Sequence, residues 1–138
     1  MSERLIEIEN QLIADVKQLN KMNAEKSLAE FTKQAWFLIE PETPLIWNWH
    51  LDTICAYLES TVPHPDRPIH VKRLIINVPP GSLKSILVSV MYNAWLWVKH
   101  PDKRVLGIAN TQDLAIRDSR KTKIIVTSEW FQERWPLG

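Results

Sequence analysis

Apolar residues recur at helical spacing over the first 25 residues of the chain, and charged residues occupy the opposite face. The apolar stripe consists of Leu5, Ile8, Leu12, Val16 and Leu19, and Ile6 and Ile13 widen it. This pattern predicts an amphipathic helix over residues 3–25. Such a helix packs either on the body of its own domain or on a partner chain. We take residues 1–26 as an N-terminal segment distinct from the rest of the chain.

Two more helices and a stiff connector are predicted between residues 27 and 71. The sequence Ser27-Leu28-Ala29-Glu30 has the form of a capping box, which predicts a helix from there to about Leu38, before two prolines. Residues 47–61 carry one apolar face and predict a third helix. Prolines at positions 63, 65 and 68 then predict a stiff connector, because proline fixes the backbone angle φ.

The pattern changes character after residue 71. Residues 72–78, which include the apolar stretch Leu74–Val78 broken only by Asn77, predict a strand of the kind found in parallel sheets, and residues 104–109 predict a second one. A helix is predicted between them over residues 84–99, and two more are predicted over 111–127, with Thr111 as the N-cap, and over 128–135. The order predicts an α/β fold: a helical N-terminal segment followed by one β-α-β unit of a parallel sheet. Two strands cannot form a stable sheet, so we expect this sheet to be incomplete.

Composition narrows the class of protein. The 138 residues fit one domain, and 17 Lys and Arg against 16 Asp and Glu give a net charge of +1, so overall basicity is no argument for nucleic-acid binding. The one cysteine, Cys55, excludes an internal disulfide framework and falls in an apolar helical pattern, where we expect a buried thiol. No apolar stretch is long enough for a membrane span, so a soluble, cytoplasmic protein that does not bind membranes is expected.

The strongest chemical signal is the loop Pro79-Pro80-Gly81-Ser82-Leu83-Lys84-Ser85, which connects the first predicted strand to the following helix. A loop of this kind cradles phosphate with backbone N–H groups, a helix N-terminus, a lysine charge and a serine hydroxyl near Mg²⁺. The two glycines of the usual phosphate-loop pattern would fall on Val78 and Leu83, so the match is partial. An ordinary strand-to-helix turn with an incidental lysine is the alternative.

The residues also resemble a known family, the large terminase subunits of tailed phages, over about residues 30–136. The loop is similar to the family's Pro-Pro-x-x-x-Lys-Ser variant. Other segments match in order and spacing: Phe37…Pro41…Pro44-Leu45…Trp49-His50…Tyr57-Leu58, Trp95-Leu96-Trp97, Arg104-Val105-Leu106, Asp113 to Lys121, and Ser128-Glu129-Trp130-Phe131-Gln132. The family is a viral DNA-packaging motor, with an ASCE-type P-loop ATPase half and a metal-dependent nuclease half.

This resemblance implies that residues 72–138 are a partial P-loop ATPase core, encoded by a bacteriophage or a prophage in a bacterial host. Its implied cofactors are ATP and Mg²⁺. Its implied partners are double-stranded DNA, the portal protein, the small terminase subunit and other copies of the same subunit. The nucleotide-binding residues would be Pro80, Gly81, Ser82, Leu83, Lys84 and Ser85, with Lys84 on the β- and γ-phosphates and Ser85 on Mg²⁺.

Further site residues are implied by the resemblance. Residues 27–71 include the family's adenine-side region, where Trp47 or Trp49 could stack on the base and His50 could hydrogen-bond to it; packing of the tryptophans is the alternative. A transition-state arginine would come from Arg117, Arg120 or a neighbouring subunit. Arg117, Arg120 and Lys121 share one helix face, which either contacts phosphate or is simply solvated.

The chain contains no apolar strand ending in Asp-Glu, which would supply the Walker B carboxylate and the catalytic glutamate, and it contains no nuclease carboxylates. Hydrolysis needs metal positioning and water activation as well as phosphate binding. We therefore expect little or no ATPase activity from this chain alone. Two other interpretations remain: a non-catalytic terminase remnant that acts only as an interaction module, and a different P-loop machine such as a helicase.

Overall fold

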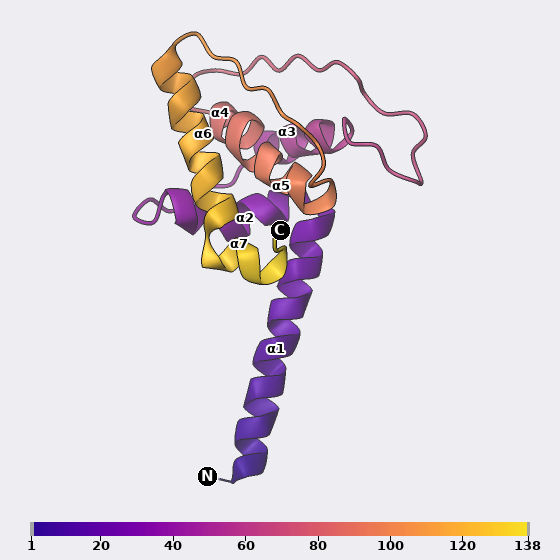
Figure 1. Cartoon of the computed structure of the whole chain (residues 1–138), viewed down its shortest axis with the longest axis vertical. Coiled ribbons are helices and arrows are strands. Elements are labelled where there is room, and N and C mark those ends of the chain that lie inside the picture. The colour runs from indigo at the N-terminus through magenta and orange to yellow at the C-terminus, as the bar shows by residue number, and fades with distance from the viewer. Residues whose placement is uncertain (1, 138) are drawn as a thin grey trace.

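A computed structural model describes residues 2–137 and shows a helical protein (Figure 1). The elements, in chain order, are α1 (Glu3–Lys26), α2 (Leu28–Ile39), α3 (Trp49–Glu59), α4 (Lys84–Ile86), the π-helical segment η1 (Leu87–Met91), α5 (Tyr92–Lys99), α6 (Gln112–Thr127) and α7 (Glu129–Arg134). Because α4, η1 and α5 follow one another without a break, they form one continuous helix over residues 84–99.

The predicted helices are confirmed, and α2, α6 and α7 each start at a residue whose hydroxyl caps the helix. Ser27 caps α2, since its hydroxyl accepts a hydrogen bond from the backbone N–H of Glu30 at 3.2 Å. Thr111 caps α6 in the same way through the N–H of Leu114, at 3.3 Å. Ser128 ends α6 and caps α7. The third helix is shorter than predicted, at Trp49–Glu59.

The core is built around α2. Leu28, Phe31 and Ala35 on this helix are completely buried. The ring of Phe31 contacts the aromatic residues of the C-terminal segment, Trp130, Phe131 and Trp135, with ring centroids 5.7, 6.4 and 5.9 Å away. The apolar faces of α3, η1, α5 and α6 complete the core. Large aromatic side chains bury the most apolar surface per residue, which explains how a chain of this size forms a core without a sheet.

The predicted α/β fold is wrong: the β-α-β unit of a P-loop ATPase is not seen. Residues 72–78 and 104–109 are extended, but no strand or sheet is formed within residues 2–137, where the one β-bridge joins His64 and Arg67. Both extended segments line one cavity of about 810 Å³, and no backbone hydrogen bond joins them across it. Apolar side chains that a sheet would cover are open to solvent, with Ile75 and Leu106 86% and 85% exposed.

Helix α1 leaves the helical body and extends away from it, so that its N-terminal end lies far from every other element (Figure 1). Its C-terminal end is fixed to the body: Ala24 is buried, and the indole N–H of Trp95 donates to the carbonyl oxygen of Ala24 at 3.0 Å. Of the two interpretations of this helix, packing along its own domain does not occur over residues 3–19, which are exposed. None of the helices that the structure describes is long and apolar enough to cross a membrane.

Candidate phosphate-binding site

The loop of residues 79–83 joins the first extended segment to the helix that starts at Lys84. Its backbone turns at two positions, Gly81 with φ of 82° and Leu83 with φ of 60°. Glycine adopts this left-handed region freely, whereas leucine does so rarely and at a cost of about 1–2 kcal/mol. Leu83 thus adopts the backbone conformation for which the usual phosphate-loop pattern supplies a glycine.

The start of this helix presents unpaired backbone donors. None of the backbone N–H groups from Gly81 to Ile86 donates a hydrogen bond to another described residue, and the first such bond runs from the N–H of Leu87 to the carbonyl oxygen of Leu83, at 3.0 Å. Unpaired N–H groups at a helix N-terminus attract anions, because they carry partial positive charge and point along the helix dipole. The loop therefore has the backbone chemistry of a phosphate cradle.

Charged side chains surround these donors. Residues 78–86 line a cavity of about 420 Å³ together with three residues of α6, namely Arg117, Asp118 and Lys121. Lys84 makes no ion pair with any described residue, whereas Lys121 pairs with Glu40 at 3.2 Å and Arg117 with Asp118 at 2.9 Å. Three cations against one carboxylate leave the lining of the cavity with a net charge of +2. An anion is the ligand that this charge favours.

Packing between α6 and η1 sets the position of the α6 side chains. Thr122 is buried, and its hydroxyl lies 3.0 Å from the carbonyl oxygen of Asp118 in α6 and 3.4 Å from that of Ser89 in η1, so one proton is shared between the two helices. Ile125, one turn further along α6, is completely buried. This contact holds the preceding turn of α6, with Arg117 and Lys121, beside the loop. The π-helical segment lies directly behind the cradle, and such segments occur frequently at functional sites.

The structure brings some of the predicted site residues to the cavity and leaves others away from it. Pro80, Gly81, Ser82, Leu83, Lys84, Ser85 and Arg117 all line it. Arg120 is exposed and does not line it. Asp118 also lines the cavity, although the sequence pattern did not single it out. It lies between Arg117 and Lys121 in the basic run, and this position is the feature of the sequence that could have identified it.

The predicted adenine-side residues do not line this cavity either. Trp47 has other contacts: its indole N–H donates to Asp52 at 2.9 Å, and the ammonium of Lys33 lies 4.8 Å from its ring centre. His50 packs against Trp49, with ring centroids 6.3 Å apart. In this arrangement Trp47 takes part in packing, which was the alternative to stacking on a base.

The residues around the loop suit a metal ion that arrives with its ligand. Within residues 2–137, no group of three or more His, Cys, Asp or Glu side chains is placed to hold a metal. Mg²⁺ is commonly held by substrate phosphates, waters and one or two protein oxygens. The lining residues offer the hydroxyl groups of Ser82 and Ser85 and the carboxylate of Asp118, whose Oδ1 already accepts hydrogen bonds from Arg117 at 3.0 and 2.9 Å.

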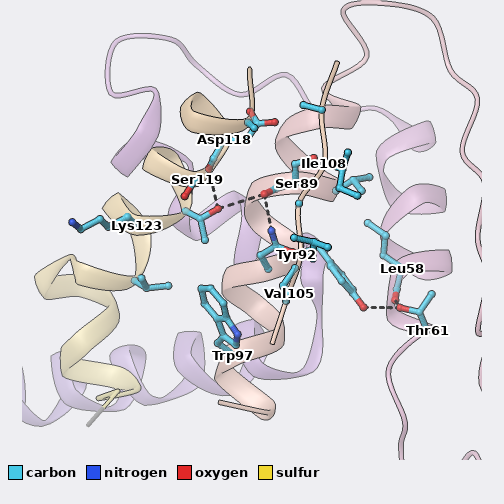
Figure 2. A pocket seen from close by; sticks show the side chains of 18 of the residues that line it. Leu58, Thr61, Ser89, Tyr92, Trp97, Val105, Ile108, Asp118, Ser119 and Lys123 are labelled. Carbon is cyan, nitrogen blue, oxygen red and sulfur yellow. Dashed lines mark hydrogen bonds between the residues drawn. The ribbon is translucent and has the colours of Figure 1, made fainter. Parts of the chain in front are cut away.

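The larger cavity, between the two extended segments, is mostly apolar. Figure 2 shows Leu58 and Thr61 on one wall, Ser89, Tyr92 and Trp97 along the floor, and Asp118, Ser119 and Lys123 of α6 on the opposite wall. The hydroxyl groups of Thr61 and Tyr92 are 2.7 Å apart and satisfy each other. This cavity occupies the space where a sheet was predicted, and it offers no cluster of donors comparable to the loop.

Comparisons of the chain with protein-family models, with curated proteins and with solved structures found no match. The likeness to terminase large subunits therefore depends on the sequence segments alone. The case for a phosphate site depends on the geometry of residues 79–86 and on the charge around them.

Proposed function

We propose that this chain binds Mg²⁺-ATP through the loop of residues 79–85, as the nucleotide-binding part of a phage terminase large subunit that powers DNA packaging. The observation that carries the proposal is the cradle itself: a run of unpaired backbone N–H groups at a helix start, with the unpaired ammonium of Lys84 and the side chains of Arg117 and Lys121 around it. The proposal concerns the loop and the helix behind it, and it needs no sheet.

The charges on the cavity favour a polyphosphate over a single carboxylate or phosphate. Lys84 is free to pair with a ligand, whereas Arg117 and Lys121 already have carboxylate partners at 2.9 and 3.2 Å. A ligand with several negative charges competes for those two cations better than a monoanion does. Mg²⁺ bound to the same ligand would offset the charge of Asp118, which otherwise repels phosphate.

We expect binding without appreciable turnover, because no Walker B carboxylate and no catalytic glutamate are present in the chain to position the metal and activate water. In the parent family the bound nucleotide would drive contacts with double-stranded DNA, the portal protein and the small terminase subunit. Those partners enter the proposal through the resemblance alone.

Isothermal titration of the folded chain with Mg²⁺-ATP tests the proposal. Lys84→Ala is expected to weaken binding by about 10- to 100-fold, since a charged hydrogen bond to phosphate contributes about 1.5–3 kcal/mol. Lys103→Ala removes an equal charge from an exposed loop away from the cavity and is expected to have no effect. Far-UV circular dichroism of each variant verifies that the helices are intact.

A second pair of variants on α6 tests the geometry. Arg117→Ala removes a lining residue and is expected to weaken binding, whereas Arg120→Ala, on the same helix but off the cavity, is expected to leave it unchanged. The proposal is refuted if the folded chain does not bind Mg²⁺-ATP, or if Lys84→Ala binds it as tightly as the parent chain. Either result would favour the alternative function, a non-catalytic interaction module.

A further inference from the structure

We infer that α1 is a self-association element: two copies of the chain pair through α1 in antiparallel orientation, with Leu12 of each helix at the centre. This inference is independent of nucleotide binding. Its starting point is the exposure of the helix, which extends away from the body over residues 3–19 (Figure 1). The apolar side chains there are about half exposed, from 49% for Ile6 to 59% for Leu12. An apolar stripe of this length in water is typical of a protein–protein contact.

The spacing of the stripe is symmetric. Its five central residues, Leu5, Ile8, Leu12, Val16 and Leu19, are separated by 3, 4, 4 and 3 positions. Reversing the chain direction about Leu12 therefore maps the stripe onto itself: Leu5 falls level with Leu19, and Ile8 with Val16. A second copy of α1 that runs in the opposite direction places its apolar residues at the same positions along the helix axis. A two-fold symmetric contact requires such a match.

The flanks of the stripe agree with the same arrangement. Ile6 and Ile13 widen the stripe along one edge only, since each follows a stripe residue directly in the sequence. A two-fold axis perpendicular to both helices keeps that edge on the same side of the pair. The two Ile13 side chains therefore flank the central pair of Leu12 residues on one side and widen the apolar contact there.

Charge selects the antiparallel direction over the parallel one. Residues 3–9 carry Glu3, Glu7 and Glu9 against Arg4, a net charge of −2, whereas the matching residues 15–21 carry Lys17 and Lys21 against Asp15, a net charge of +1. In a parallel pair the glutamates would lie beside glutamates and the lysines beside lysines. In the antiparallel pair Glu3 is level with Lys21 and Glu7 with Lys17, because each pair is placed symmetrically about Leu12, while Glu9 is level with Asp15. These charges lie on the side of the helix away from the stripe, so they form no direct ion pairs, and the preference that they give weakens as salt is added.

The C-terminal end of α1 is anchored to the body, which leaves the rest of the helix free to contact another chain. Its last turn is fixed to the body through Ala24 and through Glu25, whose carboxylate accepts a hydrogen bond from the indole N–H of Trp135 at 2.9 Å. Nucleation is the costly step in helix formation, and the anchored end of α1 supplies a nucleus from which the rest of the helix propagates. Residues 3–19 of α1 are therefore helical before they contact the second copy of the chain.

Mass and cross-linking of the full chain test the inference. Light scattering after size-exclusion chromatography is expected to give twice the chain mass of 16.1 kDa at micromolar concentration. Leu12→Asp places a charge at the centre of the stripe and is expected to give the monomer mass. Asn10→Asp adds the same charge on the opposite face of the helix and is expected to leave the dimer intact. A monomer in the parent chain, or a dimer that survives Leu12→Asp, would overturn the inference.

Single cysteines determine the direction of pairing. Under mild oxidation, Leu12→Cys is expected to form a disulfide-linked dimer, because residue 12 of one helix meets residue 12 of the other. Leu5→Cys alone is expected not to cross-link, while a mixture of Leu5→Cys and Leu19→Cys is expected to form a mixed dimer. Efficient cross-linking of Leu5→Cys with itself would show parallel pairing and contradict the inference. The native Cys55 is 2% exposed and does not interfere.

Discussion

Replacing Trp95 by phenylalanine should destabilise the whole protein, because the indole of this residue joins α1 to the body. Its N–H donates to the carbonyl oxygen of Ala24 at 3.0 Å in a buried position. The usual helical partner of that oxygen is not available, since the N–H of Leu28 donates to the carboxylate of Glu59 at 2.7 Å. Without the indole, the carbonyl oxygen of Ala24 is buried with no hydrogen bond.

The magnitude is the sum of two contributions. Leaving a buried polar group without its hydrogen bond costs about 1–3 kcal/mol. The smaller phenylalanine ring loses buried apolar contact on the scale of one methylene group, about 0.8 kcal/mol. Trp95→Phe is therefore expected to lower the free energy of unfolding by about 2–4 kcal/mol, a large part of the stability of an ordinary domain.

Trp97→Phe, two residues away on α5, is the matched control. Its indole N–H also donates to a backbone carbonyl, that of Lys103 at 2.9 Å, but this hydrogen bond is exposed. Water can replace the lost donor there, so we expect a loss below about 1 kcal/mol. Urea unfolding monitored by far-UV circular dichroism measures both variants without depending on tryptophan fluorescence. A loss for Trp95→Phe no greater than that for Trp97→Phe would refute the reasoning.

Two further predictions concern single side chains. Burial, together with the nearby charges of Glu59 and Asp52, raises the pKa of the Cys55 thiol to about 12, so an alkylating reagent at pH 8 is expected to modify it only after unfolding in urea. Since the folded form holds the proton more tightly, stability should also fall as pH rises from about 9 towards 12; equal alkylation rates in folded and unfolded protein would contradict this. Leu83→Val puts a β-branched residue at φ of 60° and is expected to weaken Mg²⁺-ATP binding in calorimetry, while Leu83→Gly is expected to retain it. Equal affinities for these two variants would mean that the left-handed backbone is not part of the cradle.

The helices could be predicted from the sequence because their determinants are local. Ser27 and Thr111 mark helix starts through their own hydroxyl groups, and the apolar spacing of α1 and α3 reflects the helical repeat. The candidate phosphate-binding loop could be singled out for the same reason, since a glycine, a lysine and a helix start lie within seven consecutive residues. The contribution of Arg117 to this site was anticipated from the basic run on α6, but not that of Asp118 beside it.

Local sequence patterns could not predict whether the two extended segments would pair as a sheet. An apolar run such as residues 72–78 indicates an extended backbone, but a strand exists only where another chain segment lies at hydrogen-bonding distance. In the structure the two extended segments both line a common cavity, and their backbone groups do not form hydrogen bonds with each other across it. The sequence by itself determined the helices, the caps at Ser27 and Thr111, and the residue types of the loop. Only the tertiary structure decided that no sheet forms within residues 2–137, that α6 supplies charges to the loop, and that α1 extends from the body, because each of these depends on which distant segments pack together.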